Sequence, residues 1–167
     1  DLTRIKNDPK FTVTSKISHR VIYFNFDHLQ RVSPFITDKA GKPLDKNPLL
    51  DVRVRRAISK AINRPAIADR VMEGQAVPSG QLVSEKLFGN VPGLKAEAFD
   101  PEGAKKLLAE AGYPDGFNIT IHGPSGRYVN DEKIVQAVAQ MLARVGIAAK
   151  VETAPMGPYA ARASKQE

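Results

Sequence analysis

The stretch "FNITIHGPSGRYVNDEKIVQAVAQMLARVGIAAKVE", residues 117–152, decides the fold class of this chain. Apolar and polar residues alternate over 117–122, which is typical of a strand, and the run at 147–152 predicts a second strand. Between them, residues 131–145 carry apolar side chains at helical spacing, and Gly146 is a typical helix stop. A strand, a helix and a strand in this order predict a parallel pair joined by a right-handed crossover, and therefore an α/β fold.

Another helix and another strand are predicted before this unit. Residues 101–111 have a helical pattern that begins after Asp100, a typical N-cap, and ends at Gly112. The run "SHRVIYFNFD", residues 18–27, has apolar residues on both faces. A strand that is covered on both sides has this pattern, so we expect a central strand over 20–26.

The remaining segments have loop-like compositions. Prolines and a glycine in 33–50 predict a loop with a reverse turn at 39–42. Residues 75–99 are irregular and long for a compact domain, which is typical of a functional loop or of a segment packed against something else. The chain starts without methionine, and its last ten residues resemble the first turns of a helix that has no stop signal. We therefore expect a piece of a larger protein.

The stretch "DVRVRRAISKAINRPAIADRVMEGQ", residues 51–75, holds much of the positive charge of a chain whose net charge is +7. Its pattern predicts two helices separated near Pro65, with basic side chains opposite one apolar stripe made by Val54, Ala57, Ile58, Ala61 and Ile62. One hypothesis is a nucleic-acid-binding helical pair. However, the second helix begins with Pro65-Ala66-Ile67-Ala68, which offers almost nothing to a base edge. A solvated charged face is the simpler interpretation.

The residue types that carry chemistry do not form a recognisable catalytic or metal-binding pattern. Cysteine is absent, and the three histidines are far apart in sequence. The segment "GPSGR" at 123–127 has neither the spacing of a nucleophile elbow nor that of a phosphate-binding loop. No apolar run has transmembrane length, and the start does not have the pattern of a signal peptide. We expect no enzyme activity, no metal and no cofactor.

Three separated motifs resemble the family 5 extracytoplasmic solute-binding proteins, which are the peptide, oligopeptide and nickel receptors of ABC importers. The first is "NPLLDVRVRRAISKAINRPAIADRVMEGQAVPS", which follows an aromatic strand ending in Asn25 as in the family. The second is "FDPEGAKKLLAEAGYPDGF", and the third is "GRYVNDEKIVQAVAQMLARVGIAAKVE". The resemblance covers nearly the whole chain in the right order. Residues 28–50 are longer than the family pattern, which indicates an inserted loop.

The resemblance implies a fold and a function that composition does not. Family members fold as two α/β lobes that close over a ligand, so residues 1–167 would be a single partial domain, namely most of the second lobe, truncated at its C-terminus. The sheet would be partly parallel and flanked by helices. The protein would be a monomeric substrate-binding component that delivers a small peptide or other solute to an ABC permease. It would lie in the periplasm, or be anchored as a lipoprotein, and would perform no bond chemistry.

The resemblance also implies that strands 20–26 and 117–122 are parallel in one sheet, so their carboxyl ends would share one edge. Ligands bind beyond the carboxyl ends of strands in such sheets. The edge would face the missing first lobe. The predicted ligand-binding residues are Tyr23, Asn25, Asp27, Arg127, Tyr128 and Asn130.

Each of these residues has a chemical role in the prediction, and that of Tyr128 is a polar contact with the ligand. Arg127 would bind a carboxylate through two hydrogen bonds, and Asp27 would meet an amino group. Asn25 and Asn130 donate and accept hydrogen bonds, and Tyr23 would stack on the ligand. The alternative is that Arg127 and Asn130 only cap the helix at 131–145. The sequence does not choose among peptides, glutathione-like molecules, opines, sugars and nickel chelates.

Overall fold

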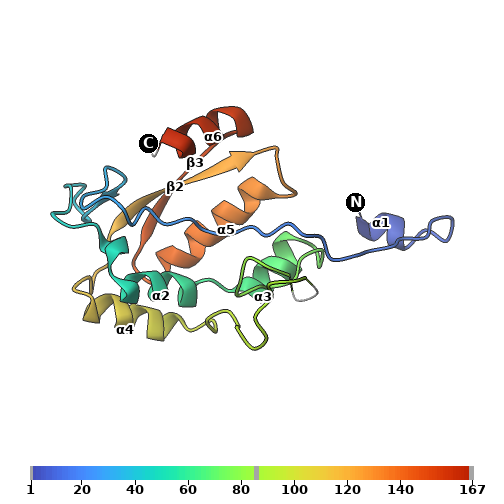
Figure 1. Ribbon diagram of the computed structural model, residues 1–167, viewed down its shortest axis with the longest axis horizontal. Helices are drawn as coiled ribbons and strands as arrows, with labels where there is room; N and C mark the ends of the chain where they lie inside the picture. The colour runs from blue at the N-terminus through green and yellow to red at the C-terminus, as the bar shows by residue number, and fades with distance from the viewer. Residues whose placement is uncertain (1, 85–86, 166–167) are drawn as a thin grey trace.

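The computed structural model describes residues 2–84 and 87–165 (Figure 1). In chain order, the elements are α1 Leu2–Lys6, β1 Ile36–Thr37, the 3-10 turn η1 Pro48–Leu50, α2 Val52–Ala61, α3 Arg64–Ala66, the π-helical turn η2 Ile67–Val71, α4 Pro101–Glu110, β2 Asn118–Ser125, α5 Asp131–Ala143, β3 Ala148–Pro155 and α6 Met156–Lys165. The expected helix near the C-terminus is therefore present up to Lys165, and the last two residues lie outside the described part.

The sheet has the order β1-β2-β3. Strands β2 and β3 are parallel over eight residue pairs, from Asn118 opposite Ala148 to Ser125 opposite Pro155. Strand β1 is antiparallel to β2, with Ile36 opposite Ile119. The predicted strand, helix and strand are thus confirmed as β2, α5 and β3, and the sheet is partly parallel and flanked by helices (Figure 1).

The core lies where the helices meet one face of the sheet. Helix α5 presents the buried Val138 and Leu142, and it approaches the sheet closely at Gly123, where an added Cβ would lie 2.9 Å from a methyl group of Val135. Helices α2 and α4 pack on each other through fully buried alanines, Ala57 and Ala104. These small side chains allow the two helices to approach closely. The predicted stripe of α2 is buried, as expected.

The predicted helix caps are present. The side chain of Asp51 accepts a hydrogen bond from the backbone N–H of Arg53 at 2.8 Å, and the side chain of Asp100 accepts one from Gly103 at 2.8 Å. Asn63 caps the second helix of the basic stretch. That helix is shorter than expected, because after three α-helical residues the chain widens into the π-helical turn η2.

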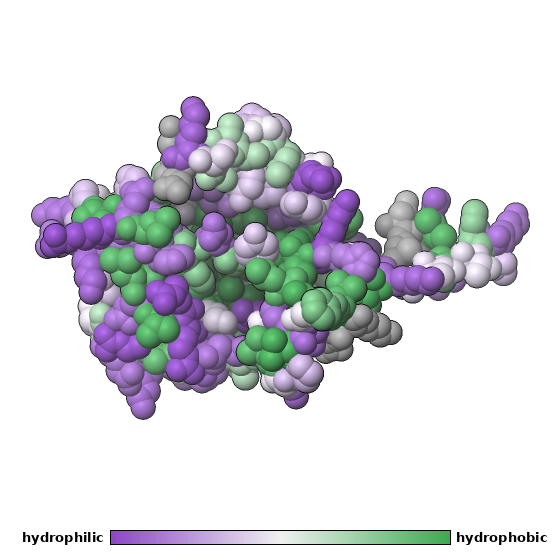
Figure 2. All heavy atoms as spheres, viewed as in Figure 1, coloured by the Kyte–Doolittle hydropathy of each residue, from purple (hydrophilic) through white to green (hydrophobic). Residues whose placement is uncertain are grey.

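The predicted strand at 20–26 is wrong. No strand is assigned to this segment, and it runs opposite to the direction of the β2 arrow instead of parallel to it (Figure 1). Phe24 and Phe26 pack partly against the core, while Ile22 and Tyr23 are 51% and 64% exposed. Apolar side chains remain visible on this face of the molecule (Figure 2). Apolar side chains on both faces of the segment predicted that it is buried on both sides. A strand also needs a neighbouring strand to which its backbone is hydrogen-bonded, and no strand in the described part of the chain pairs with this segment.

The predicted loops are confirmed, with one addition. The reverse turn near 39–42 is closed by a hydrogen bond from the backbone N–H of Asp38 to the carbonyl of Lys42 at 2.8 Å, and Gly41 has a φ of 84°. The 33–50 loop also contains the short strand β1 and the turn η1, which were not predicted. Residues 75–84 and 87–99 contain no regular element, as expected; residues 85–86 lie outside the described part.

Candidate ligand-binding edge

The carboxyl ends of β2 and β3 meet at one edge of the sheet, because the two strands are parallel and in register up to Ser125 and Pro155. The loop 126–130 continues from β2, and helix α6 continues from β3. Ligands of open α/β sheets bind beyond this kind of edge. We call Ser125, the loop 126–130 and the β3–α6 junction the β2–β3 edge.

A buried carboxylate shapes the loop of this edge. Asp131 is only 8% exposed, and one of its oxygens accepts hydrogen bonds from the backbone N–H groups of Arg127 at 2.9 Å and Tyr128 at 3.0 Å. Burial acts to raise the pKa of Asp131, but these backbone donors outweigh it and hold the pKa below its ordinary value. The backbone N–H groups of Arg127 and Tyr128 in the loop, and that of Glu132 in the first turn of α5, are therefore already bound to Asp131 and do not face an anionic ligand.

Asn130 has a structural role in this loop. It is the residue before α5, it has a left-handed backbone with a φ of 55°, and its side chain makes no cap hydrogen bond. Its amide group instead donates to the backbone carbonyl of Val71 at 2.8 Å, which ties the loop to η2. Asn130 thus occupies the N-cap position without a side-chain cap hydrogen bond, and the Arg127 guanidinium lies over the Tyr128 ring, so the alternative that these two side chains cap the helix has no support in this geometry.

Two guanidinium groups lie near one aromatic ring at the edge. The guanidinium of Arg127 is 5.3 Å from the ring centroid of Tyr128, and that of Arg20 is 6.0 Å away. Both arginines are exposed. Among the described residues, neither guanidinium pairs with a carboxylate. Both positive charges therefore remain available to an acidic group, with an aromatic surface beside them.

The other predicted residues do not gather here. The segment 18–27 runs toward η1, where the carbonyl of Asp27 accepts a hydrogen bond from Asn47 at 2.7 Å. The segment 18–27 approaches Tyr128 with its N-terminal part, at Arg20, and not with its C-terminal part, at Asp27. The expectation that the carboxyl ends of 20–26 and 117–122 share one edge is therefore wrong. Asn25 and Tyr23 are exposed along the segment between these two ends.

Arg20 and Asp131 are the edge residues that the sequence interpretation missed. Arg20 lies just before the aromatic run, but its position depends on the direction of that segment, which the sequence does not show. Asp131 follows a glycine-containing loop and precedes a helical pattern, which is the usual signal of an N-terminal carboxylate. This pattern was present in the sequence, but the helix-capping role was considered for Asn130 and Arg127 and not for Asp131.

The basic helix α2 uses its charges within the molecule. Arg56 pairs with Glu97 at 2.8 Å, and Lys60 pairs with Asp100 at 3.1 Å. Both pairs connect α2 to the segment that leads into α4, whose N-cap is Asp100, so they help to orient one helix on the other. Side chains engaged in this way are not arranged as a free row of phosphate contacts.

Three further basic side chains of this stretch, Arg53, Arg55 and Arg64, are also engaged. Arg53 pairs with Asp51 at 2.6 Å, and its hydrogen bonds lower the pKa of Asp51 to about 2. Arg55 donates to two backbone carbonyls of η1, and Arg64 donates to the carbonyl and the hydroxyl of Ser59. The nucleic-acid hypothesis therefore has no support in this geometry.

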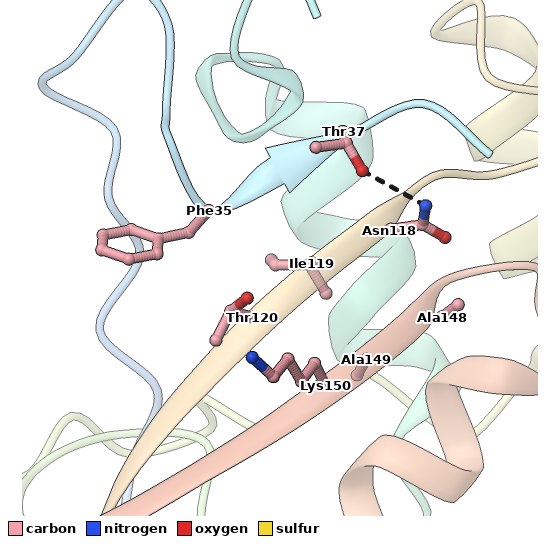
Figure 3. Close-up of a pocket in the computed structure, with 8 residues that line it drawn as sticks. All are labelled: Phe35, Thr37, Asn118, Ile119, Thr120, Ala148, Ala149 and Lys150. Atoms are coloured by element: carbon pink, nitrogen blue, oxygen red, sulfur yellow. Dashed lines mark hydrogen bonds between the residues drawn. The ribbon is translucent and has the colours of Figure 1, made fainter. Parts of the chain in front are cut away.

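A groove of about 460 Å³ lies over the sheet and is lined by residues of β1, β2 and β3, with Phe35 at one end (Figure 3). Its polar groups are partly satisfied by each other, because the amide of Asn118 donates to Thr37 at 3.2 Å. Alanines at 148 and 149 leave the space open, and Lys150 extends along it. Sheets with parallel strands are normally covered on both faces. This groove therefore has the character of a packing surface.

A polar cluster joins α6 to the same side of the sheet. The Nε2 atom of His122 lies 3.1 Å from the guanidinium of Arg162 and 3.3 Å from the carboxylate of Glu152. Burial lowers the pKa of His122, and the positive charge of Arg162 lowers it further, while Glu152 acts in the opposite direction. Neutral His122 can therefore accept a hydrogen bond from Arg162 and hold α6 beside the edge.

No group of three or more histidine, cysteine or acidic side chains within the described residues could hold a metal ion. None of the helices described is both long and apolar enough to cross a membrane.

The partly parallel sheet, the flanking helices and the edge define an α/β lobe of the periplasmic binding-protein kind. The family model described as "Bacterial extracellular solute-binding proteins, family 5 Middle" matches residues 1–167. The chain belongs to this family, as the sequence motifs led us to expect, and its curated relatives are transport binding proteins.

Two relatives and one solved structure show the extent of the similarity. The "Dipeptide-binding protein" of Escherichia coli (strain K12) is 29% identical over 170 residues, covering 100% of this chain and 29% of the relative. The "Glutathione-binding protein GsiB" of the same strain is 38% identical over 120 residues, covering 72% of this chain and 22% of the relative. The DppA protein of Helicobacter pylori in complex with the peptide STSA is 28% identical, with a TM-score of 0.62, and the match covers 77% of this chain and 24% of that one.

The chain thus spans between 22% and 29% of the length of these curated relatives.

Proposed function

We propose that this chain is most of the second lobe of a two-lobe receptor that binds a small peptide-like solute and delivers it to an ABC permease. Family membership supports the class of function, and the printed names of the relatives include a dipeptide-binding and a glutathione-binding protein. The ligand would be enclosed between the β2–β3 edge and another lobe. The receptor would be a monomer in the periplasm, or held at the membrane as a lipoprotein, and would release its solute unchanged.

The observation that carries this proposal is the pair of arginines around Tyr128. Arg127 and Arg20 approach the same ring from different segments, and neither is paired with a carboxylate in the described part of the chain. A dipeptide or a glutathione-like solute has at least one carboxylate, which a guanidinium binds through two parallel hydrogen bonds. Of the six predicted ligand residues, Arg127 and Tyr128 are therefore the ones that we retain at the centre of the site.

The other four predicted residues differ in whether they would contact the solute. Tyr23 and Asn25 are exposed on the segment that leads away from Arg20, so they would extend the site along this segment. Asn130 would act through the loop that it anchors to η2, rather than by touching the solute. Asp27 lies next to Asn47 and would contact only a solute that reaches this far.

The groove in Figure 3 supports the part of the proposal that concerns the lobe. A sheet face lined by Phe35, Thr120 and Ala148 would be covered by further structure of the same lobe, because parallel strands are normally buried on both faces. On this proposal the groove is not the solute site.

Native mass spectrometry of the intact protein would first identify a solute that co-purifies with it. Calorimetry with this solute then tests the site through Arg127→Ala. We expect the affinity to fall by more than about tenfold, because a charge-assisted bidentate contact is lost. The melting temperature should hardly change, since the exposed Arg127 side chain contacts the Tyr128 ring and forms no ion pair within residues 2–84 and 87–165.

The matched control is Arg31→Ala, which removes one exposed arginine beside η1, where the Arg31 carbonyl accepts a hydrogen bond from the backbone N–H of Asn47 at 2.7 Å. It should leave the affinity for the solute unchanged. If Arg127→Ala binds the solute as tightly as the unmodified protein, the β2–β3 edge is not the solute site.

A further inference from the structure

A second groove lies between η2 and α5, and it is distinct from the β2–β3 edge. Its volume is about 260 Å³, and its lining includes Asn63, Arg70, Val71, Gln140, Met141 and Arg144. Pockets for drug-sized molecules usually have volumes of about 300–1,000 Å³. The groove is smaller than this range and open at the surface, so it suits one or two side chains of a partner better than a whole solute.

The polar side chains that line this groove are mainly hydrogen-bond donors. Arg70 and Arg144 are exposed, and neither is paired with an acidic side chain among the residues that the structure describes. The side-chain oxygen of Asn63 already accepts a hydrogen bond from Ala66 at 3.0 Å, so the donor end of its amide remains for other contacts. None of the described residues that line the groove is acidic. It therefore differs from α2, where the basic side chains have partners within the molecule.

The backbone beside the groove is unusual. Residues 67–71 form a π-helical turn, closed by a hydrogen bond from Met72 to the carbonyl of Ile67 at 3.0 Å. Glu73 follows with a φ of 52°, a conformation that a residue other than glycine rarely adopts. Such irregularities are frequent at functional sites, because they place a side chain where a regular helix would not. Here the turn carries Arg70.

Two hydrogen bonds fix this irregular segment against α5 and its preceding loop. At one end, the backbone N–H of Asn63 donates to the sulfur of Met141 at 3.4 Å. At the other end, Asn130 donates to the carbonyl of Val71. The position of Arg70 relative to Arg144 is thus set by packed elements, which favours a preformed binding surface over two independently solvated arginines.

We propose that the groove between η2 and α5 is a docking site for an acidic segment of a protein partner, in which Arg70 and Arg144 bind neighbouring carboxylates. Charge complementarity is the basis for this partner, because the groove combines two unpaired guanidinium groups with no acid, on a chain of net charge +7. The proposal does not depend on which solute the protein binds.

The test uses the intact protein and a fluorescein-labelled hexaglutamate peptide, with binding measured by fluorescence anisotropy at about physiological salt. The double variant Arg70→Gln/Arg144→Gln should bind this peptide about tenfold more weakly or worse, because both charge-assisted contacts are lost. Hexaglutamine should bind neither protein. If the double variant proves unstable, the exposed single variant Arg144→Gln serves instead and should weaken binding several-fold.

The control variant Arg31→Gln/Lys106→Gln removes the same charge from two exposed positions elsewhere and should leave the affinity for hexaglutamate within about twofold. An equal loss in both double variants would overturn the proposal, since only the net charge would then matter. So would full displacement of the peptide by inorganic sulfate at an equal concentration, which would indicate a free-anion site. Solute binding by the groove variant, measured in parallel, should be unchanged, and this separates the docking site from the solute site.

Discussion

Asp131 illustrates how one side chain can build a binding loop without touching a ligand. Its carboxylate accepts backbone hydrogen bonds from Arg127, Tyr128 and Glu132, so it fixes the loop that presents Arg127 and Tyr128. It also completes the first turn of α5, a position at which an acid is stabilised by the helix dipole.

The variant Asp131→Asn should therefore be destabilised. An amide replaces one acceptor oxygen by an NH₂ group, which faces backbone donors, so we expect a loss of about 1–3 kcal/mol in the free energy of unfolding. Urea denaturation measures this loss. The neighbouring variant Glu132→Gln, in an exposed position that keeps an acceptor for Thr153, should be nearly neutral. Equal stability of Asp131→Asn and the unmodified protein would contradict the role of this carboxylate.

His122 should make stability depend on pH. Its pKa is lowered by burial and by Arg162, so the unfolded chain binds a proton more readily than the folded chain. Stability from this group is therefore complete above the ordinary histidine pKa of about 6.5, and it is lost as the pH falls from that value through the lower pKa of the folded state. Melting temperatures measured between about pH 7.5 and 5.5 should decline, and His122→Gln should remove part of the decline. An identical pH profile in the variant would rule out this group as the cause.

At the scale of elements, α2 separates buried from solvated side chains. Ile58 is 3% exposed, whereas the Arg56 side chain is 55% exposed and makes one ion pair with Glu97. Ile58→Asp would bury a charge in the core and should cost about 3–5 kcal/mol in the free energy of unfolding. Arg56→Ala should cost about 0.5 kcal/mol, because exposed ion pairs contribute little.

Chemical denaturation of both variants measures these two costs. If Arg56→Ala were the more damaging change, the orientation of α2 would be opposite to the one in the structure, and its basic face would have to be reconsidered.

The elements that could be predicted from sequence are those specified by local signals. Asp51 and Asp100 marked helix starts, Gly112 marked a helix end, and alternation marked β2. The two-residue strand β1 is too short to show any alternation. The prediction of a strand over 20–26 was wrong for a different reason. The pairing and the direction of this segment are set by tertiary contacts, which the local sequence pattern does not show.

The candidate site likewise has residues that local sequence patterns predict and residues whose positions depend on tertiary contacts. A loop between a strand and a helix predicted the place of Arg127 and Tyr128, since both elements have strong local patterns. The contact between Arg20 and Tyr128 joins segments more than a hundred residues apart, so no local pattern indicates it. The expectation for Asn25 and Asp27 relied on a parallel strand that the structure does not contain.

At the scale of the whole molecule, the described part of the chain has one well-packed face of a sheet, a second face that α6 covers only in part, and one edge with unpaired charge. The core lies between the sheet, α5, α2 and α4, while the opposite face carries the groove of Figure 3. Both features support the proposal that this chain is one part of a receptor that encloses its solute between two lobes.

The central claim is that the β2–β3 edge is one wall of a solute cleft. A crystal structure of the intact protein with its co-purified solute tests this claim most directly. We predict that a carboxylate of the solute lies within about 3.2 Å of the Arg127 guanidinium, a hydrogen-bonding distance, with the solute enclosed between this edge and another lobe. A solute bound in the sheet groove of Figure 3, or elsewhere with Arg127 exposed to solvent, would contradict the account.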